Sequence, residues 1–234
     1  MTTIDAHDRT VLDNPAWASL GSAHARFAEV HGRAARYEHE VAPFHALADP
    51  TDARAWADLA ALVGPGADLT VAGAPLDPFP GWAVTGSVSG VQLVDVALEP
   101  AEEPEAVVLT PADVPEILDL IDRCRPGPFR TRTIELGTYL GFRHDGKLIA
   151  MAGERLRPPG WTEISAVCTD AAYRGRGLAT RLVRAVAAGI RARGETPFLH
   201  TGAANTTAIR LYESIGFELR RSTTFGAYRC LEKS

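Results

Sequence analysis

The stretch YRGRGLAT, residues 173–180, places two glycines and two arginines between the apolar run EISAVC and a segment with helical spacing. A strand that ends near Thr169 and a helix that begins near Leu178 would gather unpaired backbone amides and a positive helix end at this turn. Gly175 and Gly177 let the backbone approach a ligand closely, and the arginines add charges that reach flanking phosphates. The residue types predict a phosphate-binding turn, although a tight turn with solvated arginines is the alternative that GRG alone leaves open.

Two better-known phosphate motifs do not fit this stretch. A P-loop carries a lysine followed by serine or threonine after its last glycine, whereas Gly177 is followed by Leu178 and Ala179. A dinucleotide fingerprint requires a third glycine where Thr180 stands. It also requires an acidic residue at the end of the next strand. The next strand here, PFLHT, ends in His200 and Thr201, neither of which is acidic.

Composition limits the class of protein. No apolar stretch approaches the roughly 20 residues that a membrane-spanning helix needs, and the amino terminus MTTIDAHDRT lacks the regions of an export signal. Cys124, Cys168 and Cys230 have no metal or redox spacing, and their odd number argues against a disulfide framework. A net charge of −5 gives no general attraction to nucleic acid. We expect a cytoplasmic protein that uses no metal, membrane or nucleic acid.

The chain divides at the run LEPAEEPEA, residues 98–106, which is acidic, contains proline and has no hydrophobic periodicity. A length of 234 residues also exceeds the usual size of one domain. We predict an amino-terminal α/β domain at residues 1–103 and a second domain at residues 104–234.

Hydrophobic spacing predicts short strands mixed with helices in both parts, and therefore an α/β fold with a mixed sheet. In the first part, helices are expected from Asn14 through Phe27 and from Thr51 through Val63. An extended segment that Pro43 interrupts is expected at 36–47, and strands are expected at 68–71 and 82–97. In the second part, the pattern predicts strands at 106–110, 141–144, 147–156, 161–168 and 197–201, helices at 111–124, 134–139, 178–190 and 206–215, a tight turn at 145–146 and a final hairpin around Gly226.

Arg174-x-x-Gly177-x-Ala179 after a strand, followed by ANTTAIRLYESIGF, resembles the coenzyme motif and next helix of the GNAT superfamily of N-acetyltransferases. The segments GPFRTRTIELGTYLGF, AMAGERL, EISAVCT and FLHTGAANTTAIRLYESIGF resemble a bacterial GNAT group with a carboxy-terminal acetyltransferase region. The resemblance covers about residues 106–229. It implies the GNAT acyl-CoA N-acyltransferase fold, and leaves open that the amino-terminal domain is a degenerate copy of that fold.

The resemblance implies acetyl-CoA as the acetyl donor, with no metal. Its pyrophosphate would lie on the amides of residues 174–179, and its pantetheine would pair with a strand that splays from its neighbour. Asn205 has two interpretations, as a helix N-cap and as a coenzyme contact. The coenzyme-binding residues that the resemblance implies are Ala166, Val167, Cys168, Arg174, Gly175, Arg176, Gly177, Leu178, Ala179, Thr180 and Asn205.

The acceptor amine must lose a proton, and Glu163 is the candidate base. It lies four residues before Val167, on the same strand face by alternation, and matches the position of the base in some family members. A tight turn would place Glu154 across from Glu163, where like charges raise the pKa of one carboxyl. The alternatives are that these glutamates bind a cationic substrate, which makes Glu154 a substrate-binding candidate, or simply face water. By the same alternation, Cys168 lies on the opposite face of the strand from Glu163, and we interpret it as a small apolar strand residue.

Tyr212 is the candidate acid, since the resemblance places its phenol near the thioester sulfur. The spacing of the apolar residues around Tyr212 also fits the buried stripe of an amphipathic helix, in which Tyr212 would only pack. Gly216 fits the position that ends this helix. Phe129, Glu135 and Tyr139 lie where GNAT folds wall the acceptor site, so we expect them to bind substrate.

Together these inferences predict transfer of an acetyl group from acetyl-CoA to a primary amine by direct attack, without a covalent enzyme intermediate. The alternatives are a non-catalytic acyl-CoA sensor and a transferase for a longer acyl group. The acceptor stays open among small amines, amino acids, antibiotics and protein amino termini. Exposed sheet edges are compatible with a homodimer.

Overall fold

The computed structural model describes residues 8–77 and 79–232, in which eleven strands form one mixed sheet in the order β1-β2-β3-β4-β11-β5-β10-β9-β8-β7-β6. The first seven residues of the segment from which we predict no export signal lie outside the described residues. The strands are β1 (Ala28–His31), β2 (Ala34–Tyr37), β3 (Phe44–Leu47), β4 (Asp68–Ala72), β5 (Trp82–Asp95), β6 (Val107–Val108), β7 (Tyr139–His144), β8 (Lys147–Glu154), β9 (Trp161–Thr169), β10 (Thr196–Gly202) and β11 (Phe217–Cys230).

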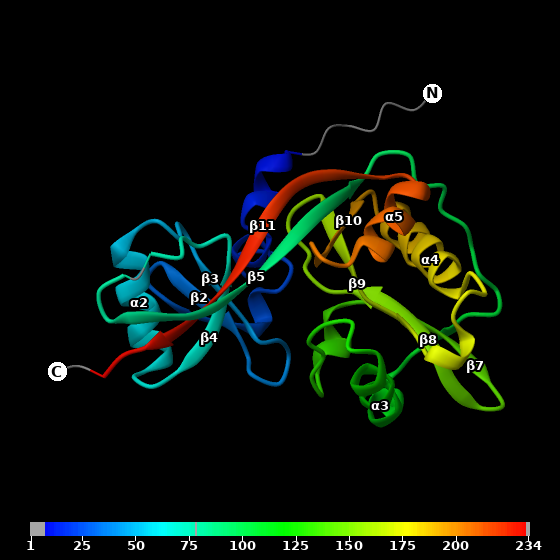
Figure 1. Ribbon diagram of the computed structural model, residues 1–234, viewed down its shortest axis with the longest axis horizontal. Coiled ribbons are helices and arrows are strands. Elements are labelled where there is room, and N and C mark those ends of the chain that lie inside the picture. The colour runs from blue at the N-terminus through cyan, green and yellow to red at the C-terminus, as the bar shows by residue number, and fades with distance from the viewer. Residues whose placement is uncertain (1–7, 78, 233–234) are drawn as a thin grey trace.

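In Figure 1, α2 lies toward one end of this sheet, and α3, α4 and α5 lie toward the other. The α-helices are α1 (Pro15–Leu20), α2 (Ala53–Val63), α3 (Val114–Cys124), α4 (Leu178–Ala192) and α5 (Thr206–Ser214), and the 3-10 turns are η1 (Arg9–Asp13), η2 (Ala25–Phe27), η3 (Pro111–Asp113), η4 (Thr133–Leu136) and η5 (Ala171–Tyr173). Helix α4 packs on β7 to β10, α5 packs on β11, and α3 packs on β8 and β9. The mixed α/β fold that the hydrophobic pattern predicted is confirmed.

The long strands β5 and β11 connect the part that carries α2 to the part that carries α4 and α5 (Figure 1). Strand β11 pairs with β4 and β5, and β5 pairs in turn with β10, all antiparallel. The predicted hairpin around Gly226 is wrong, because β11 runs straight through this residue, which pairs with Val71 and Ser87. Glycine is required there for close packing: a Cβ atom would lie 2.4 Å from the Tyr228 hydroxyl. The division of the chain into two domains stays a prediction.

The predicted helix from Asn14 through Phe27 is also interrupted. Helix α1 ends at Leu20, where Gly21 caps it through a hydrogen bond to the Trp17 carbonyl, and Phe27 lies in the separate turn η2. Helical spacing of the apolar residues therefore continued past the point where the helix ends. The prediction for α2 is confirmed, since the Asp52 side chain caps its first turn and Gly64 ends it with a φ of 79°.

Strands β9 and β10 pair in parallel only where residues 161–163 meet residues 196–198. Beyond the last pair, Glu163 with Phe198, β9 continues along β8 and β10 continues along β5. We call this opening between β9 and β10 the splay. It leaves the backbone edge of β9 that faces β10 without a partner strand, which is the feature predicted to receive an extended ligand.

Candidate active site

The turn at residues 173–180 joins β9 to α4. Gly177 caps the helix in a left-handed conformation, with a φ of 74°, and Gly175 has a φ of 76°. Within the described part of the chain, the backbone amides of residues 175–180 donate no hydrogen bond, and the first backbone bond of the helix is from Arg181 to the Gly177 carbonyl. Six consecutive free N–H groups at a helix start form a site for an anion.

Two arginines flank these amides. Arg174 donates from Nε to the Thr169 carbonyl at 3.1 Å, and the Arg176 guanidinium lies 4.9 Å from the centre of the Tyr173 ring. Both side chains are exposed, so that each can swing toward a phosphate at little cost. They add positive charge where the helix dipole is already positive.

A groove of about 670 Å³ runs from this turn to α5. It contains every residue predicted for the coenzyme except Ala166, together with Tyr212 from α5. The structure therefore brings together residues that the sequence separates by more than forty positions. The remaining lining residues are Thr169, Tyr173, Thr207, Ala208 and Leu211.

Ala166 forms a β-bulge in β9. Met151 pairs with Cys168 and Gly153 pairs with Ser165, so β9 has one residue more than β8 between these pairs, and Ala166 has a φ of 53°. An extra residue reverses the alternation of side chains beyond it. The predicted strand faces are therefore wrong, because Cys168 lies on the same face as Glu163 and Val167 does not. Burial raises the pKa of the Cys168 thiol, consistent with the apolar role predicted for it.

The two α5 residues predicted for the site face the groove. Asn205 caps the helix by accepting a hydrogen bond from the Ala208 amide at 3.2 Å, which confirms the capping interpretation. Tyr212 is 7% exposed, and burial raises its pKa to about 12, so its phenol stays protonated at neutral pH. Gly216, with a φ of 108°, ends the helix as predicted.

Glu163 is fully buried at the vertex of the splay. Its carboxylate accepts two hydrogen bonds from Arg155, both at 2.8 Å, and contacts Nδ1 of His200 at 2.7 Å. Burial by itself raises the pKa of Glu163, but the charge and hydrogen bonds of Arg155 and the hydrogen bond from His200 outweigh burial and hold this pKa well below its usual range. The carboxylate is therefore ionised.

Glu154 does not face Glu163, in contrast to the prediction. It pairs with Ile164, so its side chain points to the opposite face of the sheet, where it accepts a hydrogen bond from Arg193 at 2.9 Å. Burial raises the pKa of Glu154 above its usual value, although the charge and hydrogen bond of Arg193 partly oppose this shift. The predicted effect of one glutamate on the other therefore has no geometric basis.

His200 was not predicted from the sequence as a site residue. It pairs across strands with Gln92 of β5, whose side-chain amide is fixed because Oε1 accepts from Arg220 and Nε2 donates to the Leu12 carbonyl. The same Nε2 lies 3.0 Å from Nε2 of His200, so this histidine nitrogen is the acceptor and Nδ1 carries the proton toward Glu163. Only the pairing of β10 with β5 reveals this arrangement, because the two residues are far apart in sequence.

The residues predicted to wall the acceptor site lie in two places. Phe129 and Tyr139 are buried against each other under α3, with ring centres 5.3 Å apart. Glu135 lies at the surface, where hydrogen bonds from Arg132 lower its pKa. Their role in substrate binding stays a prediction.

A second cavity, of about 490 Å³, adjoins β10 and the amino-terminal part of the chain. We call it the aromatic cavity, because its walls include Phe44, Phe225, Pro43 and Pro128. Arg155 and His200 also line it, so the Glu163 cluster borders this cavity.

In residues 8–77 and 79–232 no group of three or more His, Cys, Asp or Glu side chains is placed to hold a metal ion. The same residues contain no helix with the length and apolar character to cross a membrane.

Comparison with known proteins gives consistent matches. The family model described as FR47-like protein matches residues 139–226. A solved structure described as an acetyltransferase of the GNAT family, from Novosphingobium aromaticivorans, is 40% identical, covers 94% of this chain and 99% of its own, and superposes with a TM-score of 0.85.

Two curated relatives match about a third of the chain. The N-alpha-acetyltransferase RimI of Mycobacterium tuberculosis is 39% identical over 34% of this chain and 51% of its own. The mycothiol acetyltransferase of Thermobispora bispora is 43% identical over 35% of this chain and 27% of its own. The alignments thus span about half or less of the length of these relatives.

Replacing Glu163 by Gln should lower the free energy of unfolding by about 3 kcal/mol or more, because Arg155 would keep a buried charge without its partner. Below the pKa of an unfolded glutamate, about 4.3, the unfolded wild-type chain takes up a proton that folded Glu163 does not. Wild-type stability should therefore fall as the pH drops from about 5 to 3, and the variant should lose less over that range. Urea denaturation at several pH values measures both effects.

Glu135→Gln is the matched control, because Glu135 also accepts two hydrogen bonds from one arginine, but at the surface. Solvent screens that pair, so its loss should cost much less. Equal destabilisation by the two variants would contradict a structural role for the buried pair.

Proposed function

The chain belongs to the GNAT superfamily of acetyltransferases and is an acyltransferase, and we propose that it moves the acetyl group of acetyl-CoA to a primary amine by direct attack. The observation that carries this proposal is the run of six free amides at the start of α4, beside the splay and within one groove with Tyr212. Acetyl-CoA combines a pyrophosphate, an extended pantetheine and a thioester, and the groove offers a matching group for each.

The pyrophosphate belongs on the amides of residues 175–180, where the helix dipole and two arginines favour negative charge. The pantetheine amides belong on the free edge of β9, as an added strand would. Bound in this way, the coenzyme would direct its thioester toward the vertex of the splay. Acetyl-CoA supplies the activated acyl group, and the chain contributes alignment and proton transfer.

Two groups that line the groove suit the chemistry of the thioester. Tyr212 has a protonated phenol in the groove and can donate to the departing thiolate. The amide of Val167, which adjoins the bulge, can donate to the thioester carbonyl. Both proposals depend on the coenzyme lying along β9.

The base proposed for the amine is Glu163, acting through His200. Glu163 has no exposed surface, whereas His200 borders the aromatic cavity and already directs its Nδ1 proton at the carboxylate. An amine in that cavity can give its proton to Nε2 of His200 as Glu163 stabilises the resulting charge. Gln92 donates to the same nitrogen at 3.0 Å, so Gln92 must release it first.

The proposal also specifies a primary amine as the acceptor and acetyl as the acyl group. One relative is named an N-alpha-acetyltransferase and the other a mycothiol acetyltransferase, and one fold can carry sites for different substrates. Comparison of thiol release from acetyl-CoA and longer acyl-CoAs decides the acyl length.

Replacing Ala179 by Glu should weaken coenzyme A binding at least about tenfold, because a carboxylate in the first turn of α4 would repel the pyrophosphate. A helix start favours an acidic residue, so the fold should tolerate the change. Calorimetry with coenzyme A measures the affinity. The matched control is Ala57→Glu on the exposed face of α2, which should bind normally. Unchanged binding by the Ala179 variant would refute this location of the pyrophosphate.

Replacing Tyr212 by Phe should lower kcat about 100-fold, because the thiolate would lose its proton donor, while coenzyme A affinity stays near that of the wild type. Thiol release measures kcat, and calorimetry measures the affinity. The control is Tyr228→Phe, which removes a buried hydroxyl bonded to the Pro75 carbonyl outside the groove. Full activity of the Tyr212→Phe variant would contradict the role of Tyr212 as a proton donor and would indicate that this side chain only packs in the core.

Replacing His200 by Gln should also lower kcat about 100-fold at neutral pH, and the loss should shrink as the pH rises and more of the acceptor arrives deprotonated. The pH profile of thiol release provides this test. His31→Gln is the control, since His31 is exposed on β1. A loss that does not change with pH would indicate a structural role for His200.

A further inference from the structure

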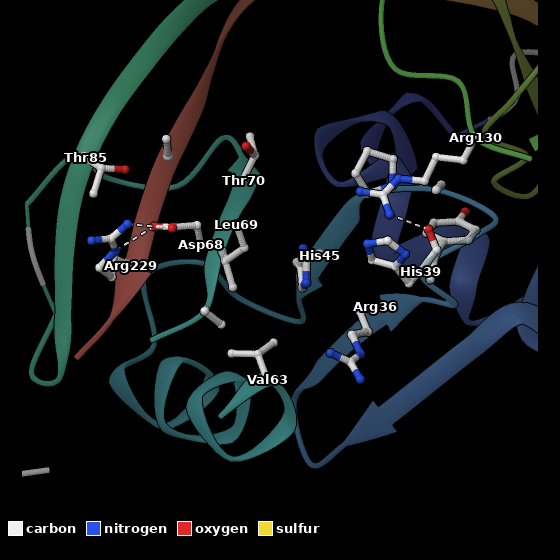
Figure 2. A pocket seen from close by; sticks show the side chains of 15 residues that line it. Arg36, His39, His45, Val63, Asp68, Leu69, Thr70, Thr85, Arg130 and Arg229 are labelled. Atoms are coloured by element: carbon white, nitrogen blue, oxygen red, sulfur yellow. Dashed lines mark hydrogen bonds and ion pairs between the residues drawn. The ribbon is translucent and has the colours of Figure 1, made fainter. Parts of the chain in front are cut away.

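A third cavity, of about 670 Å³, lies in the amino-terminal part of the chain, and Figure 2 shows the side chains that line it. We call it the basic pocket. Strands β2, β3 and β4, the end of β11 and the segment before η4 all contribute to its walls. In Figure 2, His45 lies near the centre, with Arg36 and Arg130 on one side and Arg229 on the other.

The charges of the basic pocket are opposite to those of the whole protein. The chain carries a net charge of −5, whereas three arginines and one aspartate, Asp68, line this pocket. Asp68 is already paired with Arg229 across the strands, through bonds of 2.8 and 2.6 Å. Arg36 is likewise paired with Glu29, whereas Arg130 forms no ion pair among the described residues and gives the pocket its excess of positive charge.

Both of these arginines keep donors available. Arg36 uses Nε and Nη2 to bind Glu29, and Arg130 uses Nη1 to bind the His39 carbonyl. Among the described residues, the Nη1 group of Arg36 and the Nε and Nη2 groups of Arg130 donate no hydrogen bond. An arginine with a free edge facing a cavity is suited to a phosphate or a carboxylate.

His45 supports the same conclusion. Its Nδ1 atom is buried and has no hydrogen-bond partner in the described part of the chain. Burial, together with the positive charges of Arg36 and Arg130, lowers the pKa of His45 to about 4 against weaker opposing effects. The imidazole is therefore neutral, and the pocket has a positive potential and a polar group still to be satisfied.

The basic pocket adjoins the aromatic cavity. Pro43, Thr70 and Ala227 line both, and the aromatic cavity reaches His200 beside the vertex of the splay. An acceptor that spans both cavities would place its amine at His200, run along Phe44 and Phe225, and reach the basic pocket past these shared residues. Neither the groove for the coenzyme nor the Glu163 cluster contributes to the walls of this pocket.

We propose that the acceptor is an amine with an anionic group, phosphate or carboxylate, at its other end, and that the basic pocket binds this group through Arg36 and Arg130. The inference rests on the proposed function, because it assigns the acceptor of that reaction. Cationic acceptors such as polyamines would place a second charge among arginines, which disfavours them. Arg36 from the amino-terminal part and Arg130 from the carboxy-terminal part thus select the substrate together, at a distance from the groove for the donor.

The experiment compares aminoalkyl phosphates, amino carboxylates and amino alcohols of matched chain length as acceptors in thiol release from acetyl-CoA. For the wild type, kcat/KM should be at least about tenfold higher for an anionic acceptor than for the alcohol of equal length. Inorganic phosphate should inhibit the reaction of the aminoalkyl phosphate more strongly than that of the alcohol. The phosphate and carboxylate series decide between the two anions.

Arg36→Gln, Arg130→Gln and the double variant should reduce the anionic preference stepwise toward one. Arg36→Lys should keep part of it, because lysine retains the charge but loses the planar fork. The matched control is Arg54→Gln, which removes an exposed arginine of α2 outside the pocket and should keep the preference. Circular dichroism of each variant establishes that it is folded.

The outcomes separate the two proposals. Turnover of neutral amines without any anionic preference, or a preference that survives the double variant, would overturn the basic pocket as an acceptor site and leave the acetyltransferase proposal intact. Phosphate that binds the pocket without inhibiting anionic acceptors would likewise overturn it. Absence of thiol release from every amine would overturn the proposed function, and the acceptor assignment with it.

Discussion

The ion pair between Glu163 and Arg155 is the interaction on which the site depends. Glu163 belongs to the last pair between β9 and β10, so its buried carboxylate lies where the two strands separate. Arg155 follows β8 directly and His200 comes from β10, and both bind this one carboxylate. A buried charge is costly unless it is fully paired, so the cluster has one stable arrangement. That arrangement fixes the vertex of the splay and the position of the imidazole.

Strands β5 and β11 extend this control across the molecule. Gln92 of β5 orients His200, and Arg220 of β11 orients Gln92 in turn. The same two strands carry the amino-terminal part against the site, so Phe44 and Phe225 share one cavity with His200. A ladder of backbone hydrogen bonds is stiff, and it holds the walls of the acceptor side in register with the donor side.

The donor side follows a different physical principle. The amides of residues 178–180 remain unpaired because the first turn of a helix has no preceding carbonyls, and the left-handed turn at Gly175 and Gly177 adds further free amides that suit an anion. The base of this turn is the buried face of α4, so the free amides keep their geometry without a ligand. Donor recognition is therefore built into a short local segment, whereas acceptor recognition is assembled from distant ones.

This difference explains what the sequence by itself determined. The glycine turn, the helix after it, the cap at Asn205 and the phenol of Tyr212 follow from contiguous residues, and local backbone preference fixes their positions. Spacing also gave most strands and helices, but it failed at Gly21 and Gly226, where a glycine ended one helix and served close packing in a strand. Gly21 bonds to Trp17 of its own helix and Gly226 faces Tyr228 of its own strand, so the residue type alone did not tell a glycine that ends an element from one inside it.

Only the tertiary structure decided the rest. The bulge at Ala166 reversed the strand faces, the register moved Glu154 away from Glu163, and the pairing of β10 with β5 brought Gln92 to His200. The basic pocket likewise joins β2, β3, β4 and β11, whose residues are distributed over almost the whole chain. Strand register and long-range pairing depend on the energy of the complete sheet, and no local pattern of residue types encodes that energy.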